Sequence, residues 1–175
     1  MNKVSFLLLI FFQLSSCSFH SSQYDFFKSL VVEKRNSQKP EKNWTAYWVD
    51  RKIDLYAINF ENQIIFADEN VNIFFKDNMI YKVTGLFPDN SVLDIESNSN
   101  SIIYNMNGNK IAVDLCELSQ TVIVKDLSEH YVQPCLSTEA NRHYENEINI
   151  NSEGFITEIR FKIHPDYPLL RLRIK

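Results

Sequence analysis

The sequence predicts a mainly β protein, in which antiparallel sheets form a sandwich or a partly closed barrel, with a short N-terminal helix. From Trp44 onward, short segments rich in β-branched and aromatic residues follow one another, with polar turn residues between them. The last two of these segments alternate between apolar and charged residues. The only three glycines, Gly85, Gly108 and Gly154, lie at expected turns or strand ends. Short strands and tight turns are typical of antiparallel sheets.

The N-terminus reads as a bacterial export signal that ends at a modified cysteine. A positively charged start precedes the apolar stretch Val4–Phe12, which is shorter than the about 20 residues that a membrane-spanning helix needs. Leu14–Cys17 resembles the bacterial lipobox, with an aliphatic residue, two small residues and the cysteine that carries the diacylglycerol. The alternative is an ordinary signal peptide cut beside Cys17, which would leave this thiol unmodified. We favour lipidation, because the motif lies where the apolar stretch ends.

This interpretation divides the chain into three parts. Residues 1–16 form the signal peptide, residues 17–23 the lipidated N-terminus and a linker, and residues 24–175 a single β-rich domain. Ser18 follows the cysteine in place of the aspartate associated with inner-membrane retention, which favours the outer membrane. The net charge of −4 shows no basic excess, so we expect no nucleic-acid partner.

The elements are expected in the following order. Tyr24–Lys34 has apolar residues at helical spacing and predicts the short helix, and a polar loop follows. Trp44–Asp50 predicts the first strand, with Trp44 and Trp48 on one face and Val49 on the other. The two tryptophans could form a platform for sugar stacking or fill the core; we favour the core.

The middle of the chain predicts further strands joined by tight turns. Asn107-Gly108 supplies the positive φ angles of a two-residue hairpin turn, and Gly154 indicates a similar turn. The expected strands are 53–60, 63–67, 71–75, 79–83 and 91–95, and the expected turns are Glu61-Asn62, Asp68–Asn70, Asp77-Asn78 and Pro88–Asn90.

The C-terminal segments 159–164 and 170–175 alternate most regularly and should pair through the intervening Pro-Asp-Tyr-Pro. One face is then buried and the other wet. The wet face would present a candidate anion-binding surface for an acidic polysaccharide or anionic head groups. The alternative, which we favour, is a solvated face whose cations discourage edge-to-edge aggregation. The residues concerned are Arg160, Lys162, Arg171, Arg173 and Lys175.

Cys116 and Cys135 predict a disulfide. If Cys17 carries lipid, the remaining cysteines form an even pair in an exported protein. The segment between them is long enough to run out along one strand and return along another. The alternative is two buried free thiols. No C-x-x-C motif occurs and the four histidines show no ligand spacing, so we expect no metal site and no cofactor.

The sequence shows no recognisable catalytic motif. It contains no nucleophile elbow, no metalloprotease helix motif, no P-loop and no dinucleotide fingerprint. Carboxylates are plentiful, but nothing singles out an acid–base pair of the kind that glycosidases use. We therefore expect no enzyme activity and assign no catalytic residues.

Two segments resemble the group 4 capsule lipoprotein family (YjbF/GfcB type). In residues 67–89, "ADENVNIFFKDNMIYKVTGLFPD", a strand, a tight turn and a second strand lead into Thr84-Gly85-Leu86. The tail "YENEININSEGFITEIRFKIHPDYPLLRLRIK" shows two strands, a proline-containing bend and a final strand. The resemblance implies an outer-membrane lipoprotein encoded with genes for capsule or exopolysaccharide production. It implies no known enzyme activity.

Three functions compete at this point. The first is a non-enzymatic accessory factor in capsule or exopolysaccharide assembly or export, anchored in the membrane by its N-terminal lipid, facing the periplasm and working with polysaccharide or export proteins. The second is an envelope module that binds an acidic glycan, a lipid or a partner protein. The third is a lipid-anchored hydrolase, which would need a cleft with two close carboxylates or a buried Ser–His contact. We rank them in this order.

Overall fold

The computed structural model describes residues 42–124 and 128–175. The signal peptide, the linker with Cys17 and the helix expected at Tyr24–Lys34 lie outside these residues. The described residues form strands joined by turns and loops, without a helix. The strands are β1 Trp44–Trp48, β2 Arg51–Phe60, β3 Gln63–Ala67, β4 Asn72–Lys76, β5 Met79–Thr84, β6 Leu93–Asn98, β7 Ser101–Met106, β8 Asn109–Cys116, β9 Gln120–Ile123, β10 Glu129–Ser137, β11 Arg142–Ile150, β12 Ile156–Phe161 and β13 Leu170–Ile174.

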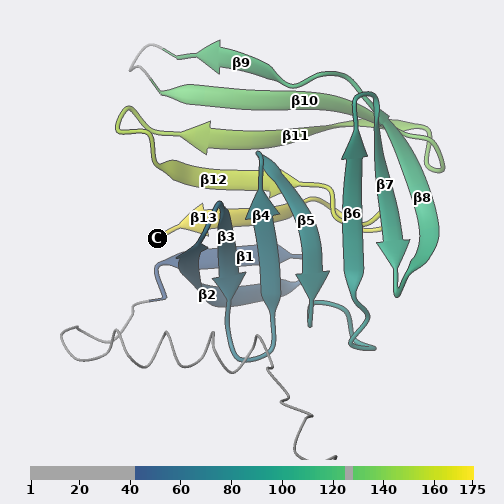
Figure 1. Ribbon diagram of the computed structural model, residues 1–175, viewed down its shortest axis with the longest axis horizontal. Helices are drawn as coiled ribbons and strands as arrows, with labels where there is room; N and C mark the ends of the chain where they lie inside the picture. The colour runs from purple at the N-terminus through teal and green to yellow at the C-terminus, as the bar shows by residue number, and fades with distance from the viewer. Residues whose placement is uncertain (1–41, 125–127) are drawn as a thin grey trace, which may run out of the picture. The chain divides into compact units, whose positions relative to one another are not determined.

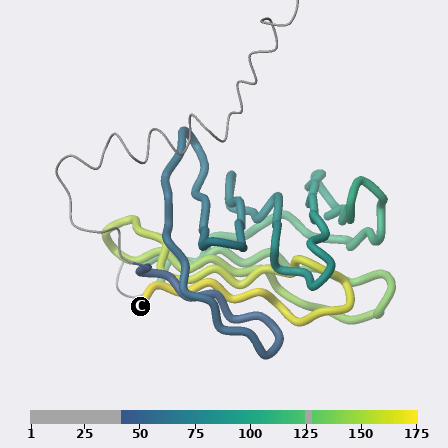
Figure 2. The backbone as a smooth tube through the Cα atoms, turned by 90° about the horizontal axis from the view of Figure 1, so that it is seen from below, coloured from purple at the N-terminus to yellow at the C-terminus, as the bar shows by residue number. Residues whose placement is uncertain are grey.

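The sheet closes on itself. Each strand from β1 to β7 pairs antiparallel with the next, β8 pairs with β10, and β10 to β13 lead back to β1. Strand β9 lies outside this ring and pairs with β10. The strands β3–β8 form one layer and cross over the layer that contains β10–β13 (Figure 1). Figure 2 shows the yellow C-terminal strands on one side and the teal strands on the other. The predicted antiparallel fold is confirmed, and the partly closed barrel is in fact closed.

Two hairpins show why the expected turns form. Asp77 and Asn78 have φ angles of 51° and 61°, and Asn107 and Gly108 have 51° and 81°. Positive φ at both central residues defines the hairpin turn whose twist matches that of the flanking strands. Asp and Asn tolerate this conformation because their short polar side chains can bond locally. The β4–β5 turn therefore forms without glycine.

The placement of Val49 on the first strand is wrong. Strand β1 ends at Trp48, which pairs with Arg51, and Val49 and Asp50 form the two-residue turn between them. Val49 has a φ of 52°, an uncommon value for a β-branched residue. The closure of the hairpin onto β2 therefore outweighs the local preference of Val49 for extended backbone.

Gly85 follows β5 and has a φ of 72°. A Cβ atom at this position would lie 1.7 Å from the backbone carbonyl oxygen of Asn70, in the β3–β4 connection. The next residue, Leu86, is fully buried. Only glycine allows the chain to pass this close to another backbone and then enter the core.

Both tryptophans of β1 lie in the core, as predicted. Trp44 is 5% exposed and Trp48 is 4% exposed. The ring of Trp44 packs on Phe66 with 4.8 Å between centroids, and that of Trp48 on Phe87 with 5.2 Å. Neither indole therefore forms a platform for an external ligand.

Candidate functional site

A pocket of about 210 Å³ lies where the β4–β5 and β6–β7 turns approach β10 and β11 (Figure 1). The turn residues Asp77, Asn78 and Ser99 line it, together with Asn98 at the end of β6. Apolar residues from the core also line it, among them Ile102, Ile148 and Phe161. The pocket thus combines polar side chains from the turns with the apolar interior of the domain.

Uncharged polar side chains form a large part of the lining of this pocket. Most of its lining residues carry an amide, hydroxyl or carboxyl side chain, and no lysine, arginine or histidine is among them. Asp77 is the one acidic residue of the lining. Such a surface offers many hydrogen bonds and no cation that would pair with an anionic ligand.

The amides on the β10–β11 wall are held in place by hydrogen bonds. Asn146 donates from Nδ2 to Gln133 Oε1 at 3.3 Å, and its Oδ1 accepts the backbone N–H of Lys162 at 2.8 Å. Gln133 Nε2 donates to the carbonyl oxygen of Glu117 at 3.4 Å. This wall of the pocket is therefore preorganised.

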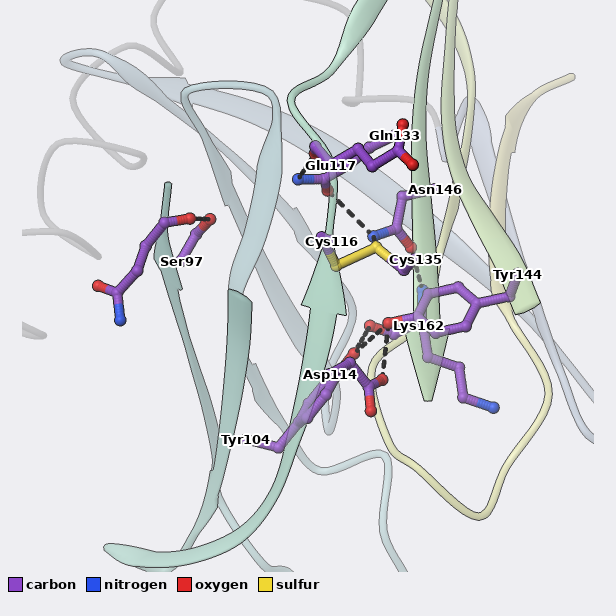
Figure 3. Close-up of a disulfide and its surroundings, with 11 residues drawn as sticks. Ser97, Tyr104, Asp114, Cys116, Glu117, Gln133, Cys135, Tyr144, Asn146 and Lys162 are labelled. Atoms are coloured by element: carbon purple, nitrogen blue, oxygen red, sulfur yellow. Dashed lines mark hydrogen bonds between the residues drawn. A yellow bond between two sulfur atoms is a disulfide. The ribbon is translucent and has the colours of Figure 1, made fainter. Parts of the chain in front are cut away.

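A disulfide joins Cys116 at the end of β8 to Cys135 in β10. The two residues are direct partners in the register of these strands, with 4.1 Å between their Cα atoms. Between them the chain runs out along β9 and returns along β10. Figure 3 shows the disulfide between Gln133 and Asn146 on one side and a buried polar cluster on the other.

The buried polar cluster consists of Asp114, Tyr104 and Tyr144. Asp114 and Tyr104 are fully buried. Burial is the largest cause that raises the pKa of each phenol, so both stay protonated. Tyr144 Oη donates to Asp114 Oδ2 at 2.7 Å, and Tyr104 Oη lies 3.0 Å from Tyr144 Oη. Because the hydrogen of Tyr144 is engaged by the carboxylate, Tyr104 donates to the Tyr144 oxygen.

Lys162 lies beside this cluster. Its Nζ is 5.8 Å from the centre of the Tyr144 ring and donates to the carbonyl oxygen of Tyr167. Burial lowers the pKa of Lys162, and the charge of Asp114 opposes this shift. Since Asp114 and Tyr104 have no solvent exposure, they cannot contact a substrate. The cluster therefore stabilises the fold where β7, β8 and β11 meet.

We expect Tyr144→Phe to lower the free energy of unfolding by about 2 kcal/mol, since Asp114 Oδ2 and the Tyr104 hydroxyl both lose a partner in a buried place. Tyr131→Phe is the matched control. It removes a phenol that donates to Glu129 Oε2 in a partly exposed place, and should cost less than about 1 kcal/mol. Urea denaturation measures both values. Equal losses in the two variants would contradict the structural role of the cluster.

Most of the basic residues of the expected wet face lie close to acidic residues. Arg160 Nη1 is 2.8 Å from Glu147 Oε1, and Arg171 contacts both carboxylate oxygens of Glu158 at 2.7 and 3.1 Å. Lys175 Nζ is 3.1 Å from Asp54 Oδ2, Lys162 is engaged as described, and Arg173 is a cross-strand partner of Glu158. This mixture of charges favours the solvated-face interpretation over a surface for anions.

Sequence reasoning missed most residues of the pocket. It identified the turn at Asp77-Asn78 but assigned no role to it, and it did not connect this turn with Gln133 or Asn146. The repeated serine and asparagine residues at 97–101 are the signal that could have marked the second turn. Asp114, inside the otherwise apolar alternation of β8, could have marked the buried cluster.

Membrane-spanning helices and metal clusters are both missing from residues 42–124 and 128–175. In these stretches, no helix is long and apolar enough to cross a membrane. The same stretches hold no group of three or more His, Cys, Asp or Glu residues arranged to bind a metal ion.

Comparison with known proteins gives a structural likeness. No family model and no curated protein matches the sequence. The solved structures include a similar chain, the hypothetical lipoprotein YmcC from Escherichia coli K12, with a TM-score of 0.52 and 12% identity. The likeness covers 87% of this chain and 96% of that one. The chain shares the fold of this lipoprotein. At this level of identity, the fold is what the likeness shows.

Proposed function

We propose that the protein is an envelope lipoprotein, anchored through Cys17 in the outer membrane and facing the periplasm, that assists the assembly or export of a surface polysaccharide without catalysing a reaction. The observation that carries this proposal is the fold shared with a lipoprotein over almost the whole of both chains. The lipobox at Leu14–Cys17 and the resemblance to the capsule lipoprotein family support it.

The pocket favours binding over hydrolysis. Glycoside hydrolysis ordinarily uses two carboxyl groups on either side of the scissile bond. Asp77 is the one carboxylate that lines the pocket, and Asp114 is fully buried outside it. A site with many amides and hydroxyls and a single carboxylate is suited to holding a polar ligand unchanged.

A deletion strain tests the proposed function. We expect surface polysaccharide to fall when the gene is removed, and to return with the wild-type gene but not with Cys17→Ala, which cannot carry the lipid. Ser18→Ala is the matched control, because it changes the neighbouring residue and keeps the thiol; it should restore the polymer. The measurement is the amount of polymer on the cell surface at equal protein abundance. Unchanged polymer in the deletion strain, under conditions where the parent makes it, would refute the proposal.

A further inference from the structure

We propose that the pocket between the β4–β5 turn, the β6–β7 turn and strands β10 and β11 binds one neutral sugar residue of a glycan. This inference rests on the proposed function for the class of ligand, and the structure adds the site and the preference for uncharged sugars. Its basis is the juxtaposition of turn amides and hydroxyls with an apolar interior in a small pocket.

The size of the pocket suits a single ring. Its volume of about 210 Å³ is below the roughly 300–1,000 Å³ of pockets that enclose drug-sized molecules. The two turns that line it carry exposed residues, among them Asn78, Asn98 and Ser99. One residue of a chain can therefore enter while its neighbours stay in solvent beside the turns.

The chemistry of the lining selects hydroxyl-rich, uncharged ligands. A sugar hydroxyl both donates and accepts, and so do the amides of Asn98 and Gln133 and the hydroxyls of Ser99 and Ser119. A carboxylate or phosphate makes its strongest hydrogen bonds to cationic side chains, which the lining does not provide, and it would meet the negative charge of Asp77. The pocket therefore disfavours acidic sugars and phospholipid head groups.

Aromatic and apolar groups complete the match. Tyr131 lines the pocket, and its hydroxyl is held by Glu129 Oε2 at 2.7 Å. Met79 and Leu118 line it as well. The C–H face of a sugar ring is apolar and packs on such groups, while its hydroxyls reach the amides. A lipid chain would leave the amides and hydroxyls of the lining without hydrogen-bond partners.

The pocket is also rigid enough to bind without much ordering. The disulfide beside Gln133 and the hydrogen bonds of Asn146 hold one wall, and the two-residue turn at Asp77-Asn78 holds another. Preorganised groups lose little conformational freedom when a ligand binds. This lowers the cost of recognising a small polar ligand.

Binding to defined oligosaccharides tests the assignment. The full lipidated protein in detergent micelles is mixed with maltotriose, cellotriose, tri-N-acetylchitotriose or trigalacturonic acid, and saturation-transfer NMR and calorimetry report contact and affinity. We expect at least one neutral trimer to bind, with saturation concentrated on one ring, and trigalacturonic acid not to bind. Tighter binding of the acidic trimer, or no binding by any neutral trimer, would overturn the assignment.

Three variants locate the binding. Ser99→Tyr fills the pocket and Asn98→Ala removes an amide without adding bulk; each should weaken binding about tenfold or more. Ser152→Tyr adds the same bulk at an exposed turn residue between β11 and β12 that does not line the pocket, and should leave binding unchanged. Thermal melting shows whether each variant is folded. If Ser99→Tyr does not fold, the binding of Asn98→Ala tests the assignment instead. Equal effects of the Asn98 and Ser152 changes would contradict the assignment.

Complementation separates this inference from the proposed function. If Ser99→Tyr fails to restore the polymer in the deletion strain while Ser152→Tyr succeeds, the pocket acts in the proposed function. If no neutral trimer binds, and Ser99→Tyr restores the polymer fully while Cys17→Ala does not, the pocket assignment fails and the accessory role stands. If deletion leaves the polymer unchanged but a neutral trimer binds in the pocket, the accessory role fails and the sugar site stands.

Discussion

Replacing Gly85 by alanine is expected to lower the free energy of unfolding by about 3 kcal/mol or more, because two penalties combine. A non-glycine residue is disfavoured at the φ of 72°, and the new Cβ would lie 1.7 Å from the carbonyl oxygen of Asn70. That oxygen cannot move away easily. Asp68 Oδ1 accepts the N–H groups of Asn70 and Val71 at 2.8 and 2.7 Å, and Asp68 N donates to the Val71 carbonyl at 2.9 Å.

Gly108→Ala is the matched control for this prediction. Gly108 has a φ of 81°, but a Cβ atom added there would have no neighbour within 4 Å. The free energy of unfolding of this variant should therefore fall only by the cost of a positive φ at a non-glycine residue, about 1 kcal/mol. Urea denaturation followed by circular dichroism measures both variants. If Gly85→Ala loses no more than Gly108→Ala, the close approach to Asn70 is not a constraint on the fold.

The Gly85 prediction gives a physical reason for Thr84-Gly85-Leu86, the stretch that resembles the capsule lipoprotein family. Gly85 lets the chain pass the β3–β4 connection, and Leu86 then enters the core. The carbonyl oxygen of Leu86 accepts a hydrogen bond from Arg51 Nη1 at 2.6 Å. The motif is thus a packing device that links β5 to β2 and the β3–β4 connection.

The double variant Cys116→Ala/Cys135→Ala is expected to lower the free energy of unfolding by about 3 kcal/mol in the chain-entropy estimate for a loop of this length. The cysteines are 19 residues apart, and their bond is direct across β8 and β10. Without the disulfide, the unfolded chain gains conformational entropy, which favours unfolding. In the folded state, loss of the disulfide loosens the wall of the pocket that carries Gln133 and Asn146.

Denaturation with and without a reducing agent measures this effect. Reduced wild-type protein should approach the stability of the double variant, and the double variant itself should not respond to the reductant. The double variant should also bind more weakly to any neutral trisaccharide that the wild-type pocket binds. Equal stability of the oxidised wild type and the double variant would show that the disulfide contributes little to the fold.

Much of the strand and turn pattern could be predicted because its causes are local. Asp77-Asn78 and Asn107-Gly108 combine residues that tolerate positive φ, and both form the expected turns. The alternation in β12 and β13 predicted their paired, half-buried arrangement. Val49 shows the limit of this reasoning, since a β-branched residue in a strand-like segment lies in a turn.

The pocket could not be predicted because its residues come from separate hairpins. Asn78, Ser99, Gln133 and Asn146 become neighbours only when the layers cross. The same holds for Asp114, whose partner Tyr144 is 30 residues away. No local pattern in the sequence states which strands will lie opposite each other.

The sequence by itself determined the antiparallel strands, most of their turns and the buried faces, because period-two alternation and positive-φ residues act within a few neighbouring residues. Only the tertiary structure decided that β8 pairs with β10 and β13 with β1, which closes the sheet. These pairings join distant segments, and their stability depends on the packing of the whole core. The polar pocket follows from that closure.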